Sequence, residues 1–281
     1  MMEQSQLDHA VINVGYEMDK AAEVFAALGF TLTERGYHTL GSINHLMMFG
    51  EDYLELIGLP TETANAPAGR PDIANVPYGL NGLVFKTDDA AETAAHLASV
   101  GMSITPPKSF SRPVKLADGE VNASFTTAHV TEGRFAGGRV YFCQHHTSDI
   151  VWRDEWQHHA NGATAISEFV IVAEEATAEA QAVGQLLGTK SNGDTGAFAV
   201  ALKGGGITIL SPENYRTRYG ALTCPMEGRS AIFGELQIRT DSLDKVRNIF
   251  RSPASEIQYQ DMGDRLLIRE PTFNALFEFV E

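Results

Sequence analysis

The alternation of apolar and polar residues along this chain repeats one plan four times. Each unit opens with a strand-like run, continues with an amphipathic or alanine-rich stretch that begins with acidic residues, and ends in further strand-like segments. The opening runs are LDHAVINV from residue 7, LNGLVFKT from residue 80, ISEFVIVA from residue 166 and FGELQIRT from residue 233. A repeated strand, helix and three strands predict an α+β protein of four βαβββ modules.

Recognisable signals bound the expected helices. The helical stretches are residues 18–30, 88–101, 174–188 and 241–251. Gly29, Gly101 and Gly188 fall at matching places near the ends of three of them, as C-caps do, and the acidic starts suit the helix dipole. In the second module the remaining strands are expected near 102–105, 121–130 and 139–146. Because the same signals recur in each unit, the repeat is a stronger inference than any single strand.

The connections divide the modules into pairs. Residues 59–79 are rich in Pro, Ala and Gly and read as a loop. The segment SDIVWRDEWQHHANGA joins the second module to the third, which predicts a first domain over residues 1–150 and a second over 151–281. Trp152 and Trp156 lie four residues apart in this segment. We expect them to anchor the two halves to each other rather than to form a platform for an aromatic ligand.

Composition narrows the function classes. The chain has 281 residues, with 21 basic against 36 acidic residues and a net charge of −15, which disfavours nucleic acid or a membrane surface as a partner. It has no apolar run near the ~20 residues of a membrane span, and its start lacks a secretory signal. Cys143 and Cys224 are too few for a disulfide framework. We therefore expect a cytoplasmic protein with a small-molecule substrate.

Several segments together resemble the vicinal oxygen chelate superfamily, which includes glyoxalase I, the extradiol dioxygenases and the bleomycin-resistance proteins. They are LDHAVINV, the LGF after the first helix, and YLELIG at the end of the first module. The segments GYHTLGSINHLMMFGEDYLELIG and YFCQHHTSDIVW are similar to its glyoxalase-like branch of uncharacterised bacterial proteins. The resemblance implies that two modules curve into one half-open barrel, or cup, with metal ligands on the first and last strands of paired modules. It also implies a possible homodimer.

Two residues are the first candidates for metal ligands. In LDHAVINV, alternation places His9 on one face with Val11, and Asp8 on the other face with Ala10. In DYLELIG, Glu55 lies among apolar residues, where a buried carboxylate is costly unless a cation meets it. His9 and Glu55 are therefore expected to face one divalent metal ion, and Glu55 is also expected to act as a catalytic proton acceptor.

The third candidate ligand comes from the last strand of the second module. We align Tyr141 with Tyr53 in the first module. This places Cys143 opposite Glu55, and His145 on the same face two residues further along. A bulge would exchange these faces and make Gln144 or His146 the ligand instead. His145 is the preferred third metal ligand.

The fourth ligand position of the family falls on Gly82, which has no ligand atom. Two imidazoles and one carboxylate with open positions suit Fe, Mn or Zn. Such an ion would act as a Lewis acid on neighbouring substrate oxygens. The departure at Gly82 disfavours the chemistry of glyoxalase I itself.

Two polar residues precede and begin the third strand of the first module. By the resemblance, His38 and Asn44 would contact the substrate at the mouth of the cup. Both could equally be turn residues, since Asn and His tolerate turn geometry. His45 is expected to be structural, and His158 and His159 are expected to be exposed in the linker.

The second half places acidic residues at the positions that correspond to His9 and Glu55. The residues at these positions are Glu168, Glu235 and Glu278, with Ile209 at the remaining one. Converging carboxylates repel one another unless they are protonated or bound to a metal. Because no histidine accompanies them, a degenerate cup that serves structure or dimer contact is favoured over a second site.

These observations predict a metal-dependent enzyme of the glyoxalase or dioxygenase type that acts on a small oxygenated substrate as a lyase, isomerase or dioxygenase. The alternative is a metal-free protein that sequesters a small hydrophobic or cationic compound, as the bleomycin-resistance proteins do. A structural or regulatory module without a small ligand is a third possibility. The motifs GxGxxG after a strand, GxxxxGK[ST], GxSxG and HExxH are all missing from the sequence.

Overall fold

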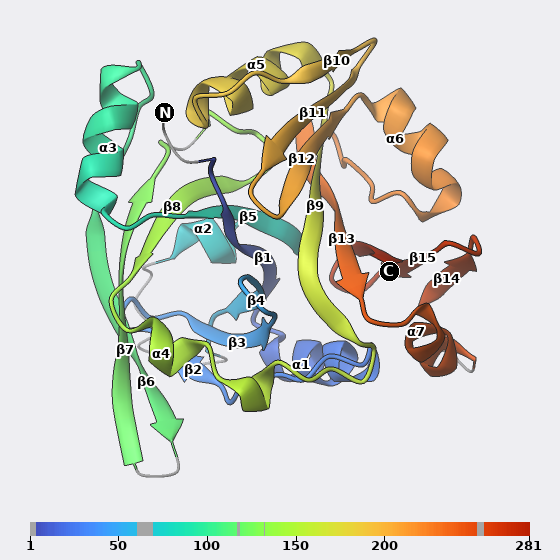
Figure 1. The fold of residues 1–281 in the computed structure, drawn as a ribbon, viewed down its shortest axis with the longest axis horizontal. Helices are drawn as coiled ribbons and strands as arrows, with labels where there is room; N and C mark the ends of the chain where they lie inside the picture. Colours follow the sequence, from blue (N-terminus) through green and yellow to red (C-terminus); the bar gives the residue numbers. More distant parts are fainter. Residues whose placement is uncertain (1–3, 61–69, 117–118, 132, 252–255) are drawn as a thin grey trace.

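Two eight-stranded mixed sheets form the scaffold of the protein (Figure 1). A computed structural model describes residues 4–60, 70–116, 119–131, 133–251 and 256–281. The sheet orders are β2-β3-β4-β1-β5-β8-β7-β6 and β10-β11-β12-β9-β13-β16-β15-β14. The second order repeats the first, strand for strand, so the prediction of an α+β fold built from four βαβββ modules is confirmed.

The first sheet takes all its strands from the first two modules. They are β1 (Leu7–Gly15), β2 (Gly36–Tyr37), β3 (Ile43–Met48), β4 (Tyr53–Gly58), β5 (Gly79–Lys86), β6 (Lys108–Leu116), β7 (Gly119–His129) and β8 (Arg139–His145). Strands β1 and β5 pair antiparallel at the centre, and β4 and β8 flank them in parallel pairing. The sequence predicted a strand near 102–105, but that segment contributes only the isolated bridge of Ile104 to Val130, and the strand is β6.

The second sheet repeats this arrangement. Its strands are β9 (Ala163–Ala173), β10 (Asn192–Asp194), β11 (Ala197–Leu202), β12 (Gly205–Leu210), β13 (Ala231–Thr240), β14 (Gln258–Asp261), β15 (Arg265–Glu270) and β16 (Ala275–Val280). Here β9 and β13 form the central antiparallel pair, flanked by β12 and β16 in parallel pairing.

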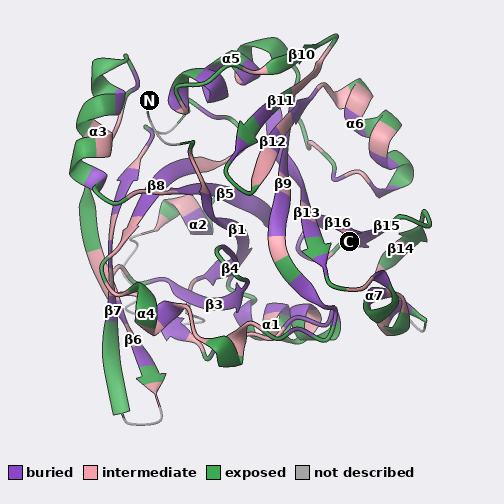
Figure 2. Cartoon of the chain, viewed as in Figure 1, coloured by how far each residue is buried: buried purple, intermediate pink, exposed green. Residues whose placement is uncertain are grey.

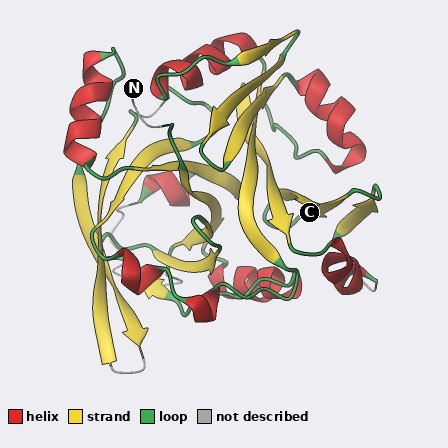
Figure 3. Ribbon diagram, viewed as in Figure 1, coloured by secondary structure: helices red, strands yellow, loops and turns green. Residues whose placement is uncertain are grey.

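Each module has one helix after its first strand, and the connections add others. The module helices are α1 (Met18–Ala27), α3 (Ala90–Ser99), α5 (Ala176–Leu186) and α7 (Leu243–Phe250). The others are α2 (Pro71–Ala74), α4 (Ser148–Val151), α6 (Pro212–Tyr219) and the 3₁₀ turns Asp154–Trp156 and Gly220–Leu222. Helices α3, α5, α6 and α7 lie at the periphery in the view of Figure 3.

The predicted helix ends are present. Gly29, Gly101 and Gly188 have φ of +88°, +86° and +61°, a region that favours glycine because it has no Cβ. The Asp89 side chain accepts hydrogen bonds from the backbone N–H groups of Ala91 and Glu92 and so caps α3.

One apolar core joins the two sheets. Phe25 on α1 packs edge-on against Phe277 on β16, with ring centroids 6.1 Å apart, and Phe30 lies 6.1 Å from Phe279. Figure 2 shows continuous buried segments along the central strands of both sheets. The helix of the first module therefore packs on the last strand of the fourth, and the two halves share a core.

The linker contacts differ from those expected. His159 is buried, because its Nδ1 accepts from the Thr31 N–H at 2.9 Å and its Nε2 donates to the Met48 carbonyl at 2.8 Å. Only His158 is exposed as predicted. Trp152 does not bridge the halves; it packs edge-on against Tyr53 within the first half, with ring centroids 5.6 Å apart. The buried polar contacts of His159 therefore add to the shared apolar core at this junction, and Trp152 does not.

Among the described residues, none of the helices combines the length and the apolar character needed to span a bilayer.

A buried carboxylate also joins the two sheets. The Asp52 side chain, before β4, accepts the backbone N–H of Ile166 on β9 at 2.9 Å. Burial raises the pKa of Asp52 to about 7. Its value in the unfolded chain is near 4, so the folded protein binds this proton more tightly, and the free energy of unfolding falls as the pH rises from about 4 through 7.

We therefore expect Asp52→Asn to raise the melting temperature by roughly 5 °C at pH 8 and to change it little at pH 4.5. The amide retains an oxygen for the Ile166 N–H but carries no charge. Thermal unfolding at both pH values measures the effect, with the exposed Asp264→Asn as a matched control. An equal change at both pH values would contradict the assignment.

Candidate active site

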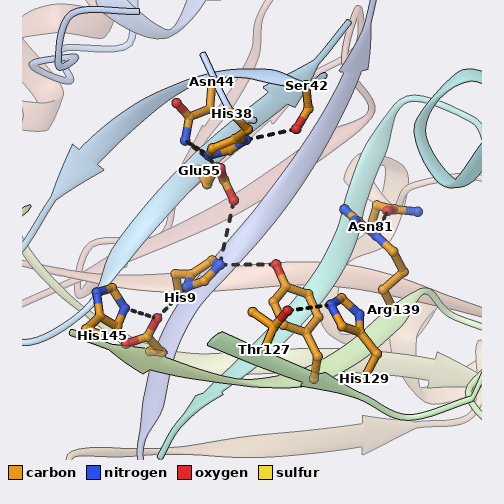
Figure 4. Close-up of polar contacts among 12 residues, drawn as sticks. His9, His38, Ser42, Asn44, Glu55, Asn81, Thr127, His129, Arg139 and His145 are labelled. Atoms are coloured by element: carbon orange, nitrogen blue, oxygen red, sulfur yellow. Dashed lines mark hydrogen bonds and ion pairs between the residues drawn. The ribbon is translucent and has the colours of Figure 1, made fainter. Parts of the chain in front are cut away.

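A cavity of about 190 Å³ lies within the first sheet. His9 on β1, Glu55 on β4 and Tyr141 on β8 line it, and we call it the His9 cavity. Its apolar wall consists of Leu40, Leu46, Ile57, Phe110 and Phe125. Figure 4 shows the polar side chains that meet around His9.

His9 is held by contacts on both ring nitrogens. Its Nδ1 lies 2.6 Å from Oδ2 of Asp8, and its ring stacks on Tyr53 with centroids 4.3 Å apart. Its Nε2 lies 3.2 Å from the Tyr141 hydroxyl and 3.6 Å from Oε2 of Glu55. Although burial opposes ionisation, contacts with His145 and His9 hold the pKa of Asp8 well below its ordinary value. The ionised Asp8 therefore accepts the Nδ1 proton, and the Nε2 lone pair faces the cavity.

A shift in strand register places Asp8 beside His9. Leu7 pairs with Phe85, but His9 pairs with Val84, so β1 has one extra residue opposite β5. Such a bulge re-aims side chains. The prediction that Asp8 lies on the face opposite His9 is therefore wrong, because strict alternation assumes a strand without a bulge.

Glu55 is linked to the other predicted polar residues. Asn44 Nδ2 donates to Oε1 of Glu55 at 2.7 Å and lies 3.3 Å from His38 Nε2. His38 Nδ1 lies 2.8 Å from Oγ of Ser42. Burial lowers the pKa of His38 to about 4, so its ring is neutral near pH 7. The structure thus brings His9, Glu55, His38 and Asn44 into one cavity and one chain of contacts.

The structure places His145 elsewhere. Its Nε2 lies 3.0 Å from Oδ2 of Asp8, and its ring packs against Trp152 with centroids 4.8 Å apart. It lines a different hollow, together with Asp8 and Cys143. The ligand atoms of these three residues all lie within 4.8 Å of one another. His145 therefore does not share the His9 cavity with His9 and Glu55.

Strand register explains this placement. In the first module His9 pairs with Tyr53 and Val11 with Glu55, whereas in the second Gly82 pairs with Arg139 and Val84 with Tyr141. Since Gly82 corresponds to His9, Tyr141 rather than Cys143 corresponds to Glu55. Our sequence alignment of β8 is therefore wrong by two residues. The reserve candidates also bond elsewhere: Gln144 donates to the Asp88 carbonyl, and His146 contacts Thr126.

The Gly82 position has no room for a side chain. A Cβ there would lie 2.7 Å from both Cβ and Cγ2 of Val11, its partner on β1. The fourth ligand position of the family is therefore filled by Val11.

The sequence analysis missed the basic residues of the cavity. Arg70, Lys108, Arg112 and Arg139 line it, against the acidic Glu55 and Asp72. Asp72 pairs with Arg70 at 2.8 Å and with Arg139 at 3.0 Å. The basic residues come from the start of α2, from β6 and from β8, and so form no single linear motif. The one available signal was in KSFSRPVKL, where alternation places Arg112 on one face with Phe110, Val114 and Leu116.

In the second half, α6 packs on the inner face of the sheet. Its Tyr215 and Tyr219 belong to the buried cluster there. Arg218 lies 2.8 Å from Oε1 of Glu168 and 3.5 Å from Oε2 of Glu278. The Tyr219 hydroxyl donates to Glu235, whose pKa burial raises well above its ordinary value. Arg218 thus offsets the predicted repulsion between the carboxylates, and the raised pKa of Glu235 favours its neutral form.

The comparisons with known proteins agree with this fold. A hypothetical protein from Staphylococcus aureus is 12% identical, with a TM-score of 0.67 over 98% of both chains. A variant of 4-hydroxymandelate synthase from Streptomyces coelicolor is 12% identical, with a TM-score of 0.57 over 99% of this chain and 92% of the other. A fusion of a xylose isomerase-like TIM barrel with 4-hydroxyphenylpyruvate dioxygenase is 9% identical, with a TM-score of 0.56 over 98% of this chain and 49% of the other.

These likenesses show the fold alone. No curated protein matches the chain significantly. The model of the glyoxalase-like domain family matches residues 7–187, more than half of the chain, from β1 through α5. Together with the paired βαβββ modules, this match confirms the resemblance to the vicinal oxygen chelate superfamily, and the chain belongs to its glyoxalase-like domain family.

Proposed function

We propose that the chain is a metal-dependent enzyme of the glyoxalase or dioxygenase type, acting on a small oxygenated substrate in the His9 cavity. The observation that carries this proposal is the approach of His9 Nε2 to Glu55 Oε2, 3.6 Å apart at the centre of the sheet. That separation allows both atoms to contact one ion at ordinary ligand distances of about 2.0–2.2 Å. Two of the solved structures with this fold are a 4-hydroxymandelate synthase variant and a 4-hydroxyphenylpyruvate dioxygenase fusion, which is consistent with this reaction class.

The donor set fits a divalent metal ion. His9 presents an Nε2 lone pair because Asp8 accepts its Nδ1 proton, the arrangement that orients metal-bound histidines. Glu55 supplies a carboxylate oxygen, and the Tyr141 hydroxyl lies beside both. His9 and Glu55 would hold the ion with open positions for substrate, and His145 would position Asp8 rather than bind the metal of this site. When bound, Fe, Mn or Zn supplies Lewis acidity toward substrate oxygens.

The chain's own residues would move and hold protons. Asn44 fixes Oε1 of Glu55, so that Oε2 points toward His9 and the cavity. Glu55 is thereby placed to accept a proton from a substrate carbon or hydroxyl. Burial raises the pKa of Tyr141, so its hydroxyl stays protonated and donates a hydrogen bond. His38 and Asn44 would contact the substrate, as the resemblance implies.

The second candidate is a metal-free binding protein. It is favoured by the filled Gly82 position and by the absence of a third His, Cys, Asp or Glu ligand close to His9 and Glu55 among the described residues. Among the charged side chains of the lining, the basic ones outnumber the acidic ones. A cationic ligand, which the net charge of the chain suggested, is therefore disfavoured. Metal content separates the two candidates.

Protein purified without added metal is expected to contain close to one transition metal ion per chain. His9→Ala is expected to lose it, and His145→Ala to retain most of it. Elemental analysis of the three proteins makes the comparison, with exposed His158→Ala as a control. Loss in His145→Ala with retention in His9→Ala would move the metal to the hollow lined by Asp8 and Cys143. Wild-type protein that neither contains nor binds Fe, Mn or Zn would favour the metal-free candidate.

Asp8→Asn is expected to weaken metal affinity by about 10–100-fold, because the amide no longer fixes the His9 tautomer. Competition with a metal-sensitive chelator measures the change. Asp264→Asn, which removes an exposed carboxylate, should leave the affinity unchanged. Unchanged affinity in a folded Asp8→Asn protein would remove Asp8 from the site.

A further inference from the structure

One arginine in the wall of the His9 cavity lacks a partner. Arg112 on β6 is only 4% exposed. Within the described ranges, its guanidinium makes no hydrogen bond or ion pair, and its Nη2 is completely buried. Burial lowers the pKa of Arg112, although Tyr53 and Glu55 oppose this shift. A buried cation without a hydrogen-bonded or ion-paired partner is costly, so its retention here points to a ligand.

The backbone around Arg112 directs its side chain into the cavity. On β6 it is buried between two half-buried residues, Ser111 and Pro113, and shares a face with Phe110 and Val114. Its stem passes over Gly36, where a Cβ would lie 3.1 Å from Cδ of Arg112. The guanidinium therefore lies in the same cavity as Glu55 without bonding to it.

A second basic side chain of the lining has a free donor. Arg139 Nε donates to Oδ1 of Asn81 at 2.8 Å, and Nη1 donates to Oδ2 of Asp72 at 3.0 Å. Its remaining nitrogen, Nη2, is buried and has no partner in the described part of the chain. Asp72 already pairs with Arg70 and Arg139, so Arg112 is the buried cation left without a carboxylate partner in this wall.

We infer that the ligand of the His9 cavity is a small monocarboxylate with an apolar body, and that Arg112 binds its carboxylate. This inference deepens the proposed function, on which it rests for the identity of the substrate cavity. The planar guanidinium matches a carboxylate through paired N–H donors. Phe110 and Phe125, stacked with centroids 5.2 Å apart, and Leu46 provide a wall for the apolar body. A neutral or cationic compound would leave the buried guanidinium unpaired.

Benzoate and benzamide test this inference, because they share shape but differ in charge. We expect wild-type protein to bind benzoate at least tenfold more tightly than benzamide by titration calorimetry at fixed ionic strength. In Arg112→Met, which keeps an unbranched apolar stem, the ratio should fall to near one. The exposed Arg216→Met should keep the wild-type ratio. Without ligand, Arg112→Met should unfold at the same temperature as wild type or higher, since it removes an unpaired buried charge.

A second variant, further pairs of ligands and measurements without metal complete this test. If Arg112→Met does not fold, Arg112→Lys should fold and show a smaller preference for the carboxylate, because it loses the paired donors. Isobutyrate and hexanoate are compared with their amides in the same way. If no carboxylate binds more tightly than its amide, the inference is wrong. It is also wrong if the preference for the carboxylate survives in Arg112→Met. Measurements in chelator and with His9→Ala separate the two proposals, because the carboxylate preference should persist there even if the metal is absent.

Discussion

The candidate site depends on a buried carboxylate that lies between two imidazoles. Asp8 contacts His9 on one side and His145 on the other, at 2.6 and 3.0 Å. A negative charge at such depth is tolerated only because both rings meet it. This contact sets the His9 tautomer, so that the nitrogen facing Glu55 and Tyr141 carries a lone pair rather than a proton. The chemistry available to the cavity thus originates in a single extra residue on β1, where the bulge brings Asp8 to the side of His9.

The two halves show how one scaffold accommodates buried acidic groups in different ways. In the first half, Glu55 faces open space and is oriented by Asn44. In the second, α6 follows β12 and brings Arg218 and Tyr219 onto the carboxylates. These side chains occupy the inner face and pair with the acids, so that Glu168, Glu235 and Glu278 each have a partner among the described residues. The difference between the halves therefore comes from the inserted helix α6 and not from the strands. The first half keeps a cavity with an unpaired arginine, whereas in the second half the side chains of α6 pair with the acids of the sheet.

Much of the fold could be predicted from the sequence, because repeated local signals specify it. The glycines that end α1, α3 and α5 and the alternation in β1 are local features, and the four-module repeat followed from them. His9 and Glu55 were also found, since a polar residue in an apolar strand is visible in the sequence. Features that depend on pairing between distant segments were not visible. The bulge at Asp8 and the register of Tyr141 are properties of strand pairs, and a two-residue error placed His145 in the wrong cavity.

The sequence analysis also missed strand β6, because the position of a strand within its sheet is set by pairing with distant segments. Pro113 argues against a central strand, but β6 is at the edge of its sheet, where a missing N–H is tolerated. Missing the strand meant missing Arg112. His159 looked like an exposed linker residue because its partners, the backbone groups of Thr31 and Met48, lie more than one hundred positions away in sequence.

The packing of Val11 against Gly82 restricts the routes by which this cavity could acquire another ligand. Histidine at position 82 alone would collide with the valine, and a smaller residue at position 11 alone would leave a void without adding a donor atom. Only the two changes together would give a donor atom at position 82 with the room that it needs. The present lining is therefore separated from one with a histidine at position 82 by two coupled changes, and a protein engineer would have to introduce both substitutions at once.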